Sequence, residues 1–388
     1  MKRKISPIME DLIVFGIMFL VVLMVVMYQK SNPIQYQMFT TEGISYEKGK
    51  VTKVLSETLE LEEGESGRFR GVQNLEVTLK TGKQKGQQIE IKNELSATHN
   101  INATEGTNII IKLDAPEGIT PFYTVFNYDR NTGIYLMIGI FLLLMLVVGG
   151  RKGIKSVIGL VFTLFFIIGF LLPAIYHGNS PVGTGILTVL VCSLFSLLLL
   201  NGFCKKTWTA LAAVFVGVLI SAGCYYLFSA ILHLSGYNLD QAEELIIIHQ
   251  NTGLQVSQIL FVGILVASLG AILDMTMSVA SSLFEMKRMH PHMERKDIFI
   301  AGMEIGKDMI GTMCETLILA FTGSAITALL VLISYGAQFQ QILNSDYIAN
   351  ELLHSITGSV GVILTVPITA FFASIALDSI HSSKKSQF

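Results

Sequence analysis

Charged residues are scarce in this sequence of 388 residues, because Asp, Glu, Lys and Arg together make up only 14% of it. Soluble domains carry roughly 25% charge, whereas here 51% of the residues are hydrophobic and the mean hydropathy is +0.58. This composition excludes an ordinary water-soluble protein and indicates a chain with much of its surface in lipid. The net charge of −2 gives no basis for binding nucleic acid, so the lipid bilayer is the first partner that the sequence predicts.

Cysteines and catalytic motifs are lacking as well. The four cysteines, Cys192, Cys204, Cys224 and Cys314, lie in or beside apolar runs and form no CxxC pair, which argues against a disulfide framework or a zinc site. The sequence has no HExxH, no P-loop and no GxSxG motif. We therefore expect no enzymatic activity and no cofactor, and any active transport would use an ion gradient or a partner's ATPase.

Long apolar runs are what the sequence has instead. A helix needs about 20 apolar residues to cross the hydrocarbon core, and eight runs approach or exceed that length: 12–28, 133–148, 154–176, 182–200, 208–232, 254–284, 310–335 and 352–380. The second run is short, and the sixth and eighth are long enough to tilt or break. The pattern predicts an α-helical polytopic membrane protein with about eight transmembrane helices.

Basic residues orient these helices, because Lys and Arg in short loops stay in the cytoplasm. With the N-terminus inside, fifteen Lys and Arg fall on the cytoplasmic side, and the short outer loops near 177–181, 233–253 and 336–351 contain none. The first run follows Lys2, Arg3 and Lys4 and lacks a small-x-small cleavage site after it, so we expect an uncleaved signal anchor. Both termini are then cytoplasmic.

The polar stretch after the first run has a different pattern. It holds twelve of the 27 Lys and Arg, and apolar and polar residues alternate in 50–55, 75–79, 88–92 and 108–113, which indicates strands with one buried face. Residues 81–86 are typical of a hairpin loop. The predicted organisation has three parts: 1–30 with the cytoplasmic N-terminus and the signal-anchor helix, 31–130 as a small extracytoplasmic β-rich domain of barrel or OB-like form, and 131–388 as a seven-helix membrane domain.

Ionisable residues inside a membrane are costly and usually mark a pathway or a partner, and here they concentrate in 274–315. Asp274 and Glu285 are close to three helical turns apart, and Asp308 lies on one face with residues four before and seven after it. Lys307 is within reach of a carboxylate three residues earlier and can neutralise it. The candidate residues for binding a substrate or a coupling ion are Asp274, Asp308, Glu315, Glu285, Glu304, Lys307 and Thr312. Asp378 either joins them or lies at the inner interface.

Small residues and methionines cluster in the same region. Gly302 and Gly306 form a GxxxG pair and are followed by Gly311; such residues allow close helix packing or a break in a helix. Half of the sixteen methionines fall within 275–313, together with His290 and His292. Thioether and imidazole groups suit soft metals such as Cu(I), but the methionines do not repeat at ligand spacing, so no metal site is predicted.

Two passages, 270–285 (GAILDMTMSVASSLFE) and 301–321 (AGMEIGKDMIGTMCETLILAF), resemble the YibE/F-like family of bacterial multispanning membrane proteins. The residues that match the family pattern are Asp274, Glu285, Gly306, Asp308, Gly311 and Thr312. Lys307 stands in place of the usual Arg, and Glu304 and Glu315 stand where neutral amides are expected. The resemblance spans roughly 130–380 and implies a bacterial cytoplasmic membrane protein with an exported N-terminal insert. It implies no established function, because members are described only as permeases or membrane proteins of unknown role.

Two functions remain open from the sequence. The first is a secondary transporter or permease for a small solute or ion, coupled to protons or cations through buried carboxylates of the sixth and seventh helices. The second is a membrane scaffold or sensor whose extracytoplasmic domain binds a partner or an envelope component. The first depends on the intramembrane acids and the second on the outer domain. A second copy of the chain, or a second related membrane protein, is left open as a partner in either case.

Overall fold

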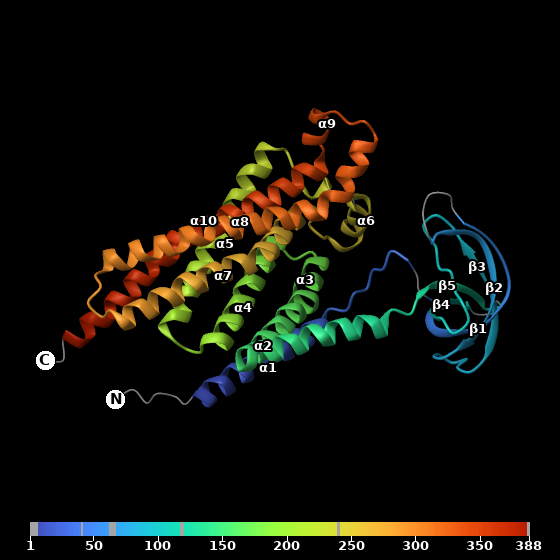
Figure 1. Cartoon of the computed structure of the whole chain (residues 1–388), viewed down its shortest axis with the longest axis horizontal. Helices are drawn as coiled ribbons and strands as arrows, with labels where there is room; N and C mark the ends of the chain where they lie inside the picture. The colour runs from blue at the N-terminus through green and yellow to red at the C-terminus, as the bar shows by residue number, and fades with distance from the viewer. Residues whose placement is uncertain (1–6, 40–41, 62–66, 117–119, 239–240, 386–388) are drawn as a thin grey trace. The chain divides into compact units, whose positions relative to one another are not determined.

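The computed structural model describes residues 7–39, 42–61, 67–116, 120–238 and 241–385. The chain forms two compact units (Figure 1), one of residues Phe39–Met145 and the other of residues Met1–Met38 with Leu146–Phe388. The smaller unit, called the β unit below, contains the strands and the first part of one long helix. The larger unit, called the helical unit below, contains the remaining helices.

The smaller unit is built on one antiparallel sheet of five strands in the order β3-β2-β1-β4-β5. The strands are β1 (Ile44–Leu61), β2 (Phe69–Leu79), β3 (Gln88–Leu95), β4 (Asn108–Asp114) and β5 (Phe122–Tyr128). β1 is long enough to pair with β2 over most of its length and with β4 over its first half. Irregularities in its pairing between Val51 and Lys53, and between Val54 and Ser56, bend it as β-bulges do. The sheet is therefore curled.

The alternation in the sequence places one face of each strand in the core of this unit. In β3, Ile89, Ile91, Asn93 and Leu95 are buried and the residues between them are exposed. Two polar side chains, Gln73 and Asn93, also lie in this core. They are hydrogen-bonded to each other, since the Asn93 amide donates to Gln73 Oε1 at 3.1 Å. The four predicted strand segments lie in β1 to β4. The sequence analysis missed β5 and the full length of β1.

The helices follow the apolar runs. They are α1 (Pro7–Ser31), α2 (Asn131–Phe166), α3 (Leu172–Tyr176), α4 (Pro181–Asn201), α5 (Lys205–Ile231), α6 (Ala242–Thr252), α7 (Ile259–Met289), α8 (Arg295–Ser334), α9 (Phe339–Leu343) and α10 (Asp346–Lys385). Local signals set several ends: Ser180 caps α4 with Pro181 in its first turn, and Glu294 with Asp297 forms a capping box at the start of α8. α6 lies in a stretch that was predicted to be an outer loop.

Seven helical segments of the described chain are long and apolar enough to cross a membrane, where the sequence analysis predicts eight runs. The difference lies in Asn131–Tyr176, which joins the second and third predicted runs into one segment of 46 residues. At 1.5 Å per residue this segment would be roughly 70 Å long, more than twice the roughly 30 Å of a hydrocarbon core. Its helix is interrupted at Gly150, whose φ of 52° and ψ of −134° are not helical.

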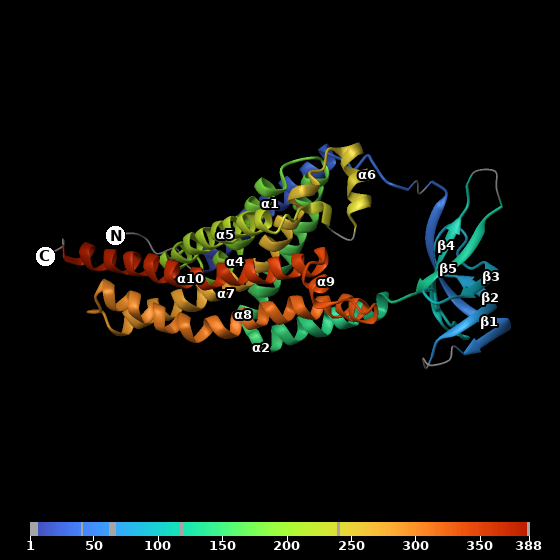
Figure 2. The ribbon, with the colours of Figure 1, turned by 90° about the horizontal axis from the view of Figure 1, so that it is seen from above.

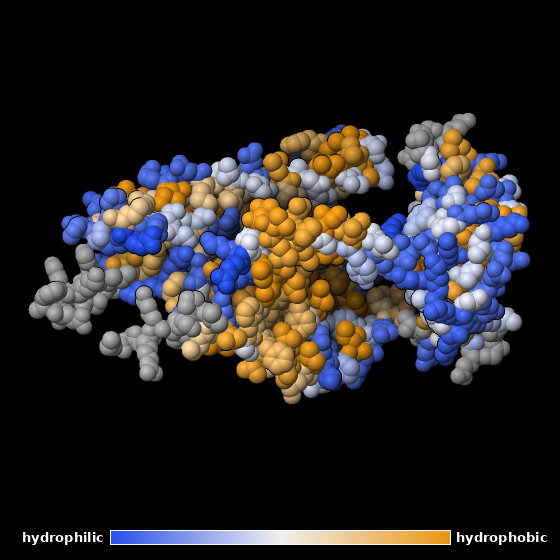
Figure 3. Space-filling view, turned by 60° about the horizontal axis from the view of Figure 1, so that its bottom comes forward, coloured by the Kyte–Doolittle hydropathy of each residue, from blue (hydrophilic) through white to orange (hydrophobic). Residues whose placement is uncertain are grey.

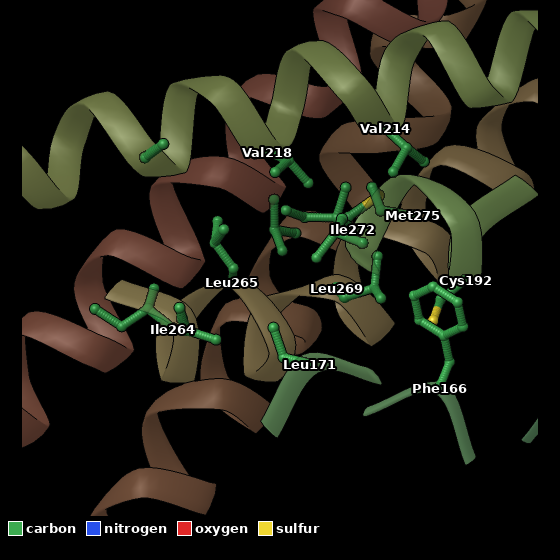
Figure 4. Close-up of a cluster of buried hydrophobic side chains, with 14 of the residues drawn as sticks. Phe166, Leu171, Cys192, Val214, Val218, Ile264, Leu265, Leu269, Ile272 and Met275 are labelled. Carbon is green, nitrogen blue, oxygen red and sulfur yellow. The ribbon is translucent and has the colours of Figure 1, made fainter. Parts of the chain in front are cut away.

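The side chains on the surface of the helical unit indicate whether it is surrounded by water or by lipid. Phe162, Val189, Leu265 and Ile272 belong to a buried core that the helices share, part of which is drawn in Figure 4. Outside this core, large apolar side chains such as Leu20, at 59% exposure, face outward. Figure 3 shows a broad apolar surface over the helices and a largely polar surface over the strands. So much apolar surface is stable only in lipid, and the protein is a multi-pass membrane protein.

α10 connects three other helices of the bundle. It packs against α5, α7 and α8, and α7, α8 and α10 run alongside one another in Figures 1 and 2. α7 and α8 form a helical hairpin, and α8 and α10 are joined through α9.

Candidate functional site

Small residues bring the N-terminal part of α8 into close contact with the C-terminal half of α10. Gly302 and Gly306 of α8 are buried, and a Cβ at Gly302 would lie 2.7 Å from the Cβ of Ala370. A Cβ at Gly306 would lie 2.8 Å from Cγ2 of Val366 and closer still to Cγ1. The GxxxG pair of α8 thus crosses Val366 and Ala370 of α10, four residues apart, as small-residue motifs do in membranes. Gly311, in contrast, is exposed and has open space at its Cβ position.

α5 makes a matching contact on another side of α10. Gly217 lies against Thr365, and Ser221 lies against Gly361. A Cβ at Gly361 would also lie 3.3 Å from Ile272 of α7. These close contacts set the position of α5, α7 and α8 along the axis of α10.

These contacts set the register of the predicted site residues. Gly302 meets Leu283 of α7, and Gly358 of α10 lies near both Ser268 of α7 and Leu317 of α8. Counting along the antiparallel α7–α8 hairpin from these contacts places Asp274 level with the stretch of α8 around Asp308 and Thr312. The sequence analysis treats these as one group, and the structure brings them to one level.

The structure does not bury the predicted carboxylates. Asp274, Glu285, Glu304, Asp308 and Glu315 are all exposed on the surface of the helical unit. Glu285 pairs with Arg288 three residues later. Glu304 pairs with Lys307 at 2.6 Å.

α8 carries this exposed polar face along a helix that is long and apolar enough to cross the membrane. Only 11% of its most apolar stretch is buried, against 39% to 50% for the helices around it in the bundle, α4, α5, α7 and α10. Thr312 is exposed, and its hydroxyl donates to the carbonyl of Met309 at 3.0 Å. Asp378 is exposed near the C-terminal end of α10. α1 is also little buried, at 17%, but its exposed side chains are mainly apolar and need only lipid.

Two ionisable residues that the sequence analysis missed lie on α10. Glu351 accepts a hydrogen bond from the hydroxyl of Ser324 of α8 at 3.4 Å, and the ring of His354 meets the ring of Phe321 edge-on at 5.7 Å. The last predicted run begins at 352, so Glu351 fell outside it, and His354 was passed over as an isolated polar residue within it. The usable signal was their spacing of three residues, which puts both on one helix face.

The described residues contain no group of three or more His, Cys, Asp or Glu side chains placed to hold a metal ion. The methionines of 275–313 are divided between α7, α8 and the short loop that joins them, where Met293 lies. Met275 is fully buried in the hydrophobic core, where it packs as an ordinary apolar residue (Figure 4).

The β unit has a cavity of about 560 Å³ between its two edge strands. Side chains of β3 (Glu90, Lys92, Glu94) and of β5 (Phe122, Tyr123) line it together with His99. Lys92 and Glu94 pair at 2.6 Å, and the hydrogen bond and charge of Lys92 lower the pKa of Glu94. The cavity is open to water and mixes charged with aromatic groups.

One ion pair ties the two ends of the β unit's chain together. Lys48 of β1 and Asp129, which follows β5, are 3.0 Å apart. Partial burial by itself raises the pKa of Asp129, but the hydrogen bonds from Lys48 and from the backbone of Asn131, with the charge of Lys48, outweigh it. The pKa of Asp129 is lowered overall, so the ion pair stabilises the folded unit at neutral pH.

Comparison with known families accounts for most of the chain. Residues 137–379 match the family described as YibE/F-like protein, and residues 44–121 match the YibE/F family N-terminal domain. The chain belongs to the YibE/F-like family. The first match covers nearly all of the helical unit after α1, including α7, α8 and α10, and the second covers β1 to β4. The resemblance predicted from 270–285 and 301–321 is confirmed. No curated protein matches the chain, and neither does any solved structure.

Proposed function

We propose that this YibE/F-like protein is a secondary transporter of a small solute or ion in the bacterial cytoplasmic membrane. Transport would be coupled to a proton or cation that binds the carboxylates of α7 and α8. The observation that carries the proposal is the exposed polar face of α8, where Asp308, Thr312 and Glu315 follow one another at helical spacing.

The topology proposed is the one that the basic residues favour, with both termini cytoplasmic and the β unit outside. Asn131–Tyr176 would then cross the membrane twice, with the chain turning at Gly150 beside Arg151 and Lys152 on the inner side. Its length of 46 residues and the non-helical backbone at Gly150 support this division. The total would be eight crossings.

The β unit is proposed to be an OB-like barrel that is not fully closed. An OB-fold is a five-stranded, partly open Greek-key barrel. In the order β3-β2-β1-β4-β5 the edge strands β3 and β5 contact each other, and hydrogen-bonded pairing between them would close such a barrel. The cavity between these two strands lies where that closure would occur.

The physical argument for transport is the cost of charge in lipid. An acidic side chain within a transmembrane helix normally faces a partner or a water-filled path. In α8 the face opposite the α10 contact carries Glu304, Asp308 and Glu315, so that face needs water or protein beside it. A second copy of the chain, or a second related membrane protein, would cover this face and exclude lipid from it. The path enclosed in this way would bind a cation or proton at successive depths in the membrane. No catalytic step is part of this proposal.

A growth survey under ion, acid and toxic-solute stress would test the proposal. A strain lacking this gene would be complemented with the wild type, with Asp308→Asn, with the matched control Asp346→Asn at the exposed start of α10, or with residues 35–125 deleted. Equal amounts of each protein in the membrane must first be shown. We expect a stress phenotype that the wild type and Asp346→Asn rescue and Asp308→Asn does not.

The alternative function, a sensor or scaffold, has one observation in its favour. The 560 Å³ cavity in the β unit combines charged and aromatic side chains, as ligand sites often do. In the same survey, rescue by Asp308→Asn but not by the deletion of residues 35–125 would contradict transport and favour this alternative.

A further inference from the structure

Glu351 and His354 form a polar pair on the side of α10 that faces α8. They are three residues apart, so their side chains lie on neighbouring positions of one helix face. Glu351 accepts from Ser324 Oγ at 3.4 Å, and Ser324 also accepts from the hydroxyl of Tyr347 through its carbonyl at 3.4 Å. The ring of Phe321 covers His354.

The imidazole of His354 is incompletely satisfied. Its Nε2 atom is buried and has no hydrogen-bond partner among the residues that the structure describes. Leaving a buried polar atom unpaired costs about 1–3 kcal/mol, and such atoms in native proteins call for an explanation. An unpaired imidazole nitrogen on a residue three positions along a helix from a carboxylate is explained if it takes up and releases a proton.

Register along α8 gives the depth of the pair. The α8–α10 contacts run in order from Gly302 with Ala370, through Cys314 with Ser359, to Ser324 with Glu351. α8 continues ten residues beyond Ser324, to Ser334, which is roughly 15 Å. The pair therefore lies well below the end of α8 that the proposed topology places at the outer surface.

We propose that Glu351 and His354 form a proton-binding site in the part of the helical unit that the proposed topology places in the outer half of the membrane. The further step, that the proton is the coupling ion of transport, rests on the function proposed above. A proton fits this pair better than a metal ion does. Protein metal sites use three or four ligands, whereas this pair supplies two, and no third His, Cys, Asp or Glu joins them in the described residues.

No other pair of titratable residues near this level would compete with Glu351 and His354 for the proton. By the same register, α7 presents Phe261 and Ile264 at this level, and neither titrates. The titratable groups nearest in level are His233, just beyond the end of α5, Tyr225 and Tyr226 of α5, and Cys314 and Glu315 of α8. On α10 itself they are Asp346 and Tyr347. None of these combines an acid with a base one helical turn apart.

A carbodiimide tests proton binding without knowledge of the substrate. A protonated carboxyl group in an apolar site adds through its oxygen to the central carbon of dicyclohexylcarbodiimide, and its proton moves to one nitrogen of the reagent. The acyl group then migrates from that oxygen to the other nitrogen, and a stable N-acylurea remains on the side chain. The full chain, in lipid vesicles, would be treated at pH 5 to 9 and the labelled residues found by mass spectrometry. Asp346, exposed at the start of α10, is the internal control.

We expect Glu351 to be labelled at pH values at which Asp346 is not. We also expect His354→Gln to move the midpoint of the Glu351 labelling curve by roughly one pH unit or more, because two groups that share a proton titrate as a pair and not as separate residues. His354→Asn repeats the test if His354→Gln does not fold. Labelling of Glu351 only at the acid pH that labels Asp346, or a midpoint that neither histidine variant moves, would overturn the proposal.

The transport step has its own test. In the growth survey, Glu351→Gln should lose rescue of any phenotype that wild type rescues. If wild type itself rescues no stress, the transport function fails while the labelling result stands. If wild type rescues and Glu351→Gln does so equally well at every pH, the assignment of this pair to coupling is wrong while transport stands.

Discussion

The contact between α8 and α10 can be tested by adding a single methyl group. In Gly306→Ala the new Cβ would lie 2.8 Å from Cγ2 of Val366, 3.0 Å from its Cβ, and closer still to Cγ1. Carbon atoms pack at about 3.5–4.0 Å, and three atoms of one short side chain cannot all rotate away. The two helices would have to separate by roughly 1 Å or more, and overpacking of this kind costs about 1–3 kcal/mol.

Gly311→Ala is the matched control on the same helix, because its Cβ would meet nothing within 4 Å. Both variants gain the preference of a helix for Ala over Gly, about 1 kcal/mol, so this term cancels in the comparison. We expect Gly306→Ala to be less stable than Gly311→Ala by about 1–3 kcal/mol.

The assay is unfolding of the purified chain by SDS in mixed micelles, followed by circular dichroism. A second change, Val366→Ala, should restore most of the stability of Gly306→Ala because it removes Cγ1 and Cγ2, the two atoms that the new Cβ would approach most closely. If Gly306→Ala is as stable as Gly311→Ala, the close contact between α8 and α10 is wrong, and with it the depth register of the site.

Three further predictions concern other parts of the chain. Gln73→Leu in the β unit should cost about 1–3 kcal/mol, because it leaves buried partners unsatisfied, whereas the exposed Gln88→Leu should cost little, as hydrogen exchange of the β unit would show. Because the folded-state pKa of Asp129 is lowered, its pairing with Lys48 stabilises the unit above the pKa of an unfolded Asp, about 3.9, and the contribution is lost as the pH falls through the folded-state pKa. Asp129→Asn should therefore lower stability by about 1 kcal/mol at pH 7, and the effect should disappear once the carboxyl is protonated in both states; an effect that does not decrease as the pH is lowered would contradict the ion pair. Gly150→Ala should destabilise α2 by about 1–3 kcal/mol, because its φ of 52° and ψ of −134° are unfavourable for a residue with a Cβ, and a neutral result in SDS unfolding would show that the turn can straighten.

The sequence predicted the membrane helices well because length and apolar content alone decide which segments enter lipid. The alternation in β3 likewise predicted its buried residues. β5 was missed because its aromatic-rich sequence, FYTVFNY, alternates weakly between apolar and polar residues. The interruption at Gly150 was predicted as a gap between two runs, but hydropathy does not show whether a helix continues across such a gap.

The candidate site was less predictable for a different reason. Helical spacing showed that Asp308 and Glu315 share a face, but spacing cannot show which face of α8 docks on its neighbours. That is decided by Gly302 and Gly306 meeting Val366 and Ala370 of a helix some 60 residues later in the chain, and such tertiary pairing is absent from the local pattern. Glu351 was missed because it lies just before the last apolar run, and His354 was missed because a search for apolar runs gives no weight to a single polar residue inside one.

The most direct test of the central proposal, that the exposed face of α8 borders a water-filled transport path, is the water accessibility of residue 315. In a chain whose four cysteines are replaced by alanine, Glu315→Cys would be treated in membranes with a membrane-impermeant maleimide. Leu20→Cys, on the exposed apolar face of α1, is the control for a lipid-facing position. If a water path exists, position 315 should be labelled many times faster than position 20. Equal, slow labelling at both positions would show that this face of α8 meets lipid or protein alone and would contradict the transport path.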